Sequence, residues 1–85
     1  MNASPSTDAS GTRVRVIGWR VGAQAVSAIQ AIREATRLGL ADAKRLVDDV
    51  LSGAPIVLDV VDEQSAQRLV STLDRLKFDA QLVGA

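Results

Sequence analysis

The sequence predicts an α+β fold in the order β-α-α-β-α-β, with three helices packed on one face of a small three-stranded sheet. Two segments alternate polar and apolar residues, and a third segment is rich in β-branched residues, so all three are expected to be strands. Three longer segments repeat apolar residues at helical spacing. A helix joins the last two strands and can serve as a parallel crossover. The three helices are therefore expected to share one face of the sheet.

The first strand and the first helix are predicted from the pattern of the N-terminal half. Residues 13–17 alternate, with Val14 and Val16 expected to point inward. Gly18 weakens this strand, which is therefore expected to bend or end nearby. Residues 23–38 contain neither Gly nor Pro and are rich in Ala, Gln, Arg and Ile, a composition that favours a helix.

The middle of the chain predicts a second helix and a second strand. The helix is expected to follow directly after Gly39, because apolar residues then recur at helical spacing until Gly53, a favoured helix stop. Pro55 cannot continue a helix, and residues 56–61 are β-branched enough to form a strand.

The C-terminal part completes the expected core. A third helix begins after Asp62, a favoured N-cap, and carries one apolar stripe, and residues 78–83 alternate as a last strand. The residues expected to be buried together are Ile32, Leu40, Ala43, Val47, Leu58, Leu69, Leu73 and Leu82.

The composition limits the chemistry of the chain. Its 85 residues make at most one domain, expected over residues 13–85 after a polar, disordered lead over residues 1–12. The absence of Cys and His removes disulfides, thiolate zinc sites and imidazole catalysis. We therefore expect a protein that is not an enzyme and needs no metal or other cofactor. Without a secretory signal or an apolar run of about 20 residues, a cytoplasmic location is expected.

Charge is distributed unevenly along the chain. Residues 13–45 carry seven basic and two acidic residues, a balance of +5, whereas residues 46–85 carry three basic and seven acidic residues, a balance of −4. Such polarity favours encounters with an acidic protein partner. One Trp and one Phe are too few aromatic residues for a nucleic-acid surface, and nothing indicates a membrane partner.

Trp19, at the strand end, is expected to cap the edge of the core, the alternative being an exposed binding residue.

The predicted first helix carries two apolar stripes. One contains Ala28 and Ile32, and the other, about 100° around the helix, contains Val26, Ile29 and Arg33. A helix on a small sheet buries one stripe easily. The second stripe either packs on a neighbouring helix or forms an exposed apolar ridge flanked by basic residues, which would suit a partner helix with an acidic rim.

The junction of the first two helices resembles that of a known family. Residues 36–47 read TRLGLADAKRLV, and the C-terminal domain of the bacterial large-subunit ribosomal stalk protein has the pattern T-x-L-G-L-x-x-A-K-x-L-V there. The resemblance covers about 70 of the 85 residues and has the same element order. It implies a free-standing relative that lacks the stalk protein's dimerisation region and hinge.

The resemblance also implies a function and a binding surface. The family's domain binds translational GTPases through its first two helices, so the partner expected here is such a GTPase or a ribosome-associated factor. The matching residues, together with a nearby arginine, make the predicted partner-binding set Val26, Ile29, Arg33, Arg37, Leu40 and Lys44, and Gly39 also matches. The chain departs from the family at Ala25 and Gln30, where the family has lysines, and at Arg37, where it has glycine. Because the two lysines are missing, affinity for translational GTPases is expected to be weak or lost, each missing charge mainly slowing association.

Two other functions fit the same fold class. One is a module like the protease adaptor that delivers N-degron substrates, whose pocket contains a histidine that this chain lacks. The other is a structural or oligomer-forming subunit, in which the ridge at Val26 and Ile29 pairs with a second copy. An enzyme fits least, because the sequence has no acid–base couple and no phosphate-binding loop.

Overall fold

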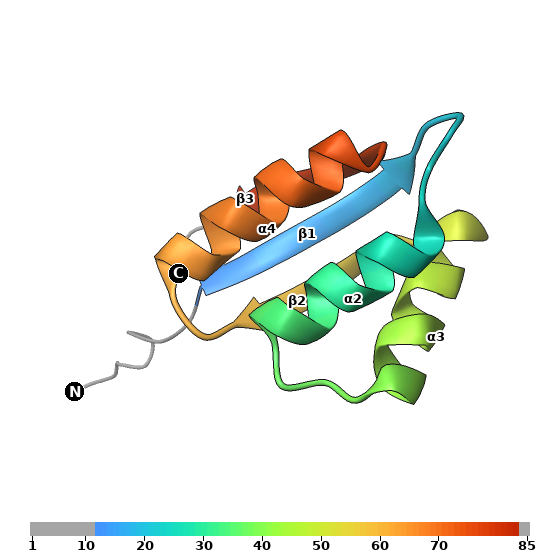
Figure 1. Cartoon of the computed structure of the whole chain (residues 1–85). Coiled ribbons are helices and arrows are strands. Elements are labelled where there is room, and N and C mark those ends of the chain that lie inside the picture. Colours follow the sequence, from blue (N-terminus) through green and yellow to red (C-terminus); the bar gives the residue numbers. More distant parts are fainter. Residues whose placement is uncertain (1–11, 84–85) are drawn as a thin grey trace.

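The computed structural model describes residues 12–83, which form two layers (Figure 1). A three-stranded sheet makes one layer, and three helices cover one of its faces. The elements, in chain order, are β1 (Thr12–Trp19), α2 (Ala25–Ala35), α3 (Leu40–Leu51), β2 (Ile56–Val60), α4 (Glu63–Arg75) and β3 (Phe78–Val83). This is the predicted β-α-α-β-α-β order. The expected disordered lead lies outside the described residues, except that Thr12 begins β1.

Strand β1 lies in the centre of the sheet, whose order is β2-β1-β3. Both neighbours run antiparallel to β1, with Val14 opposite Leu58 on one side and Leu82 on the other. Strands β2 and β3 therefore run parallel to each other but are separated by β1. Helix α4 connects them across the sheet, as the crossover prediction requires.

Strand β1 continues through Gly18, where the sequence indicated a bend or an end. The pairing with β3 shifts between Val16 and Gly18, so the strand contains an irregularity of the β-bulge type and then pairs Trp19 with Phe78. Trp19 remains 45% exposed. It is not among the side chains that pack against the core, so the expectation that it caps the core edge is not met.

The helix–helix junction differs from the prediction. Helix α2 ends at Ala35, and α3 does not follow directly but begins at Leu40. Thr36 explains the early end, because its hydroxyl donates a hydrogen bond to the carbonyl of Ile32 (2.7 Å) and accepts one from the amide of Leu38 (3.2 Å). These bonds give the backbone an alternative to a further helical turn.

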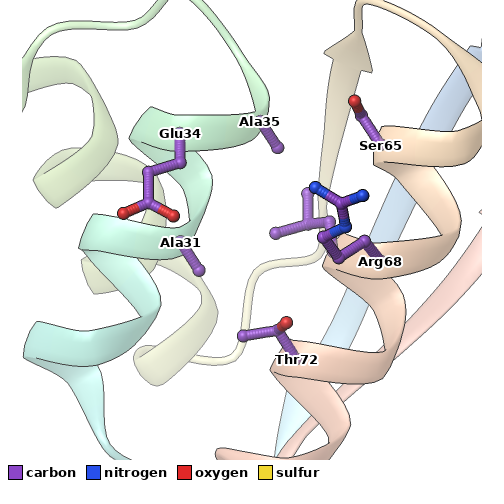
Figure 2. Close-up of a pocket in the computed structure, with 7 residues that line it drawn as sticks. Ala31, Glu34, Ala35, Ser65, Arg68 and Thr72 are labelled. Carbon is purple, nitrogen blue, oxygen red and sulfur yellow. The ribbon is translucent and has the colours of Figure 1, made fainter.

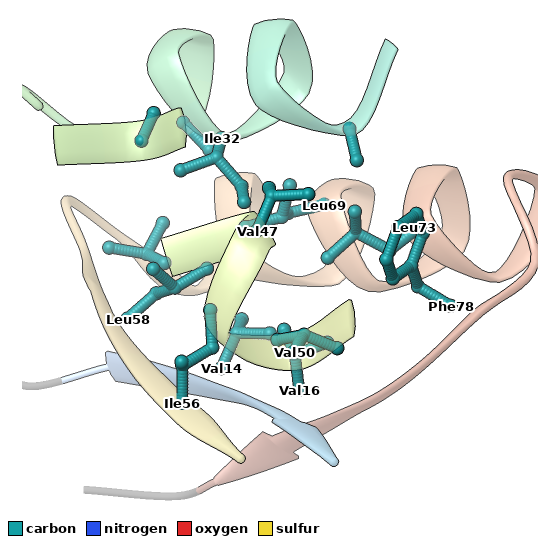
Figure 3. Packing of buried hydrophobic residues seen from close by; sticks show 14 of the residues in the cluster. Val14, Val16, Ile32, Val47, Val50, Ile56, Leu58, Leu69, Leu73 and Phe78 are labelled. Carbon is teal, nitrogen blue, oxygen red and sulfur yellow. The ribbon is translucent and has the colours of Figure 1, made fainter. Parts of the chain in front are cut away.

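The core lies between the sheet and the helices (Figure 3). Six predicted core residues are buried, namely Ile32, Ala43, Val47, Leu58, Leu69 and Leu73, and Val14 and Val16 point inward as expected. Phe78, which the sequence did not single out as core, is 1% exposed. Figure 3 shows its ring beside Leu73.

Two core predictions were wrong. Leu40 is 57% exposed, because it is the first residue of α3 and lies beside α2 rather than over the sheet. Leu82 is 40% exposed, because it lies near the end of an edge strand and has a neighbouring strand on one side only.

The end of β1 is tied to the turn between α4 and β3. The Arg20 Nη2 group donates to the carbonyl oxygen of Asp74 at 2.9 Å, and Nε lies 3.1 Å from the Asp79 carboxylate. The turn itself contains Lys77 with φ 73°, a left-handed conformation at the end of α4. These contacts join segments that are more than fifty residues apart in the sequence.

Helix α4 begins as predicted, with Asp62 as its N-cap. The amide of Ser65 donates a 2.7 Å hydrogen bond to the Asp62 carboxylate, and this bond lowers the pKa of Asp62 from its ordinary value of 3.8. Because the pKa of Asp62 is lower in the folded state, the ionised carboxylate stabilises the fold above pH 3.8. This stabilisation is lost as the pH falls through the folded-state pKa.

Replacement of Asp62 by asparagine tests this linkage. Asparagine is also a good N-cap but does not titrate, so the variant should keep its helix at neutral pH. As the pH falls below 3.8, the wild-type protein should lose more stability than Asp62→Asn, because the other carboxylates are common to both chains. Urea unfolding at a series of pH values measures the difference. Parallel curves for the two proteins would contradict the expectation.

Candidate protein-binding groove

A groove lies between helices α2 and α3, on their solvent-facing side. Its volume is about 380 Å³, and we call it the α2–α3 groove. Its lining residues are Val26, Ile29, Gln30, Arg33, Leu40 and Lys44. Five of the six residues predicted to bind a partner therefore surround one groove.

The apolar residues of the groove differ in exposure. Val26 is 78% exposed and Leu40 is 57% exposed. Ile29, which was expected to be exposed, is half-buried because it also packs against the core. Of the two interpretations of the second stripe, the exposed ridge is correct for Val26, while Ile29 lies partly against the core.

The cations of the groove are exposed. Arg33 and Lys44 both lie on the surface, and Lys44 Nζ is 4.0 Å from the carboxylate of Asp48, one turn further along α3. Arg45, the residue after Lys44, is also exposed and lies 3.6 Å from Asp42. Exposed pairs of this kind contribute little to stability, so these cations can exchange their partners at small cost.

Arg37 does not line the α2–α3 groove. It lies in an adjacent depression of about 480 Å³, which we call the polar hollow. The polar hollow is lined by Gln30, Arg33, Glu34, Thr36, Arg37 and Leu38, so it shares Gln30 and Arg33 with the groove. The sequence prediction treated Gln30 only as a departure from the family and missed it as a lining residue. Its position four residues after Val26, on the same side of a helix, is the signal that could have identified it.

A third, smaller depression of about 100 Å³ lies between α2 and α4 (Figure 2). Two hydroxyl groups, from Ser65 and Thr72, line it, but the chain has no histidine to activate them. Figure 2 shows the Glu34 carboxylate turned away from Arg68. This depression therefore lacks the paired groups that a catalytic centre needs.

The described part of the chain, residues 12–83, contains no group of three or more acidic side chains that could hold a metal ion. None of its helices is long and apolar enough to cross a bilayer.

The fold and the α2–α3 groove define a small α+β module with an exposed apolar surface between two helices. The model of the ribosomal protein L7/L12 C-terminal domain matches residues 14–76, so the chain belongs to this family. The resemblance at the helix junction is thereby confirmed. A ribosomal protein family of this kind is not enzymatic, in agreement with the prediction from composition.

Curated relatives support the assignment. The chain is 41% identical over 72 residues to the large ribosomal subunit protein bL12 of Pseudomonas syringae pv. tomato. The matched region covers 84% of this chain and 56% of the relative. For bL12 of Photobacterium profundum the identity is 42% over 71 residues, covering 84% and 53%. For bL12 of Staphylococcus saprophyticus it is 34% over 62 residues, covering 72% and 48%. The chain thus spans about half the length of the curated relatives it matches. No solved structure gives a significant match.

Proposed function

We propose that the chain is a cytoplasmic, non-catalytic interaction module that binds a translational GTPase or a ribosome-associated factor through the α2–α3 groove. The observation that carries this proposal is the convergence of five residues from two helices on one exposed apolar groove. The family supplies the expected kind of partner. The groove supplies a surface that could hold it.

The exposed apolar residues are not explained by helix stability. Leu40 is the first residue of α3 and Val26 is the second residue of α2, and an acidic residue near a helix N-terminus would stabilise either helix by about 0.3–1 kcal/mol. The positions are instead occupied by large apolar side chains that remain in water. Apolar residues placed against the local preference are expected where a surface serves binding.

The chemistry of the groove favours an amphipathic helix as the bound segment. Apolar side chains of such a helix would cover Val26, Ile29 and Leu40. Each side chain removed from water contributes favourably to the free energy of binding, by about 25 cal/mol per Å² of buried apolar area. Arg33 and Lys44 at the margin would attract acidic residues and raise the rate of association.

The two departures from the family affect this surface unequally. Gln30 lines the groove, whereas Ala25 packs against the core. A neutral Gln30 leaves one cation fewer at the point where the partner would dock. The chain is therefore expected to associate with acidic partners more slowly than relatives that carry lysine at this position.

Binding of purified translational GTPases to the chain, measured by calorimetry, tests the proposal. Val26→Asp should weaken binding at least tenfold, because it places a carboxylate in the groove. The fold should be unaffected, because Val26 is 78% exposed and lies in the first turn of α2. Ile29 is a poorer probe, since its partial burial means that a charge there would also reduce stability.

Val57→Asp is the matched control. Val57 is 55% exposed on β2, and its neighbours Ile56 and Leu58 point toward the helices, so Val57 faces the side of the sheet without helices. The Val57→Asp variant should bind the translational GTPases with wild-type affinity. Equal loss of binding in both variants, or no binding of any translational GTPase by the wild type, would argue against the proposal.

A further inference from the structure

The α2–α3 groove and the polar hollow form a continuous surface along one side of α2. They share Gln30 and Arg33, and the connection between α2 and α3 borders the hollow through Thr36 and Leu38. A bound segment longer than the groove would extend over the polar hollow at this end.

The polar hollow presents two guanidinium groups. Arg33 and Arg37 are both exposed, and neither forms an ion pair with another residue in the range 12–83. The Thr36 hydroxyl is already bonded to Ile32 and Leu38, so the two arginines are the cationic groups of the hollow that can receive a ligand, beside the neutral amide of Gln30. Glu34 also lines the hollow and leaves a net charge of +1 from these three side chains.

The helix turns beyond the groove carry the opposite charge. Toward its C-terminus α3 presents the exposed residues Asp48 and Asp49, and Asp48 lies close to Lys44. A segment lying across both helices therefore meets cations at the end of the site near Arg37 and anions at the end near Asp48. Opposite charges attract and like charges repel across such a contact, so the two orientations of a segment with one acidic end differ in energy.

We infer that this surface binds its partner segment in one orientation, with the apolar face in the α2–α3 groove and an acidic end on the polar hollow, where Arg33 and Arg37 bind its carboxylates. The inference rests on the proposed function and adds to it the chemical class of the partner. The partner is an amphipathic helix whose acidic residues lie at one end rather than along its whole rim. Guanidinium groups suit this role because they donate paired hydrogen bonds to a carboxylate.

Two synthetic helical peptides test the inference. Both carry leucines on one face, and one ends in two glutamates where the other ends in two glutamines. Titration of the full chain, followed by NMR, should show that the glutamate peptide binds about fivefold more tightly. Arg37→Ala should remove this difference while leaving the affinity for the glutamine peptide unchanged. Arg75→Ala, which removes an exposed charge from α4, is the matched control and should preserve the preference.

A nitroxide label on the glutamate end of the peptide reports the orientation. It should broaden the amide signals of Leu38 and Gly39 more strongly than those of Asp48 and Asp49. Stronger broadening at the aspartates, or an Arg37→Ala variant that keeps the preference for glutamate, would overturn the inference and leave the groove as a binding site. Failure of both peptides to bind the wild type would overturn the proposed function together with this inference.

Discussion

Replacing Leu73 with alanine is expected to lower the free energy of unfolding by about 2–5 kcal/mol. The side chain is 0% exposed and lies on the apolar stripe of α4 beside the ring of Phe78 (Figure 3). Its removal exchanges buried apolar contacts for a cavity that the sheet and the helices cannot fill. Small domains have a free energy of unfolding of only about 5–15 kcal/mol. This loss would therefore remove a large fraction of the stability and lower the melting temperature.

Leu82→Ala provides the control for this prediction. The sequence assigned both leucines to the core, but Leu82 is 40% exposed on an edge strand. Its truncation should cost less than about 1 kcal/mol, since part of the side chain is in water in either state. Urea unfolding of the two variants, followed by circular dichroism, measures both effects. Similar shifts of the two midpoints would mean that the assignment of core and edge is wrong.

Replacing Leu40 with aspartate is expected to reduce partner binding more than tenfold without lowering stability. Leu40 contributes an exposed side chain to the α2–α3 groove, and a buried carboxylate at the centre of an interface is costly. At the first position of α3, however, aspartate interacts favourably with the helix dipole. The melting temperature should therefore stay the same or rise while binding of the proposed GTPase partner is lost.

The neighbouring variant Ala41→Asp separates contact from charge. Ala41 is exposed in the same turn of α3 but does not line the groove, so the variant adds the same charge outside the contact surface. It should bind with nearly wild-type affinity. If Ala41→Asp and Leu40→Asp weakened binding equally, the effect would come from long-range repulsion, and Leu40 would not be a contact residue.

Several features of the fold follow from short stretches of sequence. The alternation around Val14 and Val16 predicted the inward face of β1, and Asp62 was predicted as the N-cap of α4. Both predictions are correct because the physical cause is local. A strand places successive side chains on opposite faces, and an N-cap side chain bonds an amide in the first turn of its own helix.

The candidate groove was predictable only in part. The second apolar stripe left two interpretations open, packing on a neighbouring helix or an exposed ridge, and Val26 is exposed. The sequence did not show that Ile29 is shared with the core, because this depends on how closely α2 approaches the sheet and its neighbouring helices. The position of Arg37 was also not evident. It depends on Thr36, whose hydrogen bonds end α2 and place Arg37 beside the polar hollow instead of on a further turn of the helix.

By itself the sequence determined the order of the elements, the apolar stripes that face inward and the family to which the chain belongs, because periodicity, capping and a contiguous motif are all properties of neighbouring residues. The tertiary structure alone decided that β1 is central, that Leu40 and Leu82 remain exposed, and that residues from two helices meet in one groove. These features depend on contacts between distant segments, such as the pairing of Val14 with Leu58 and Leu82. Which of these contacts form depends on which apolar surfaces remain to be covered once the helices and strands have formed.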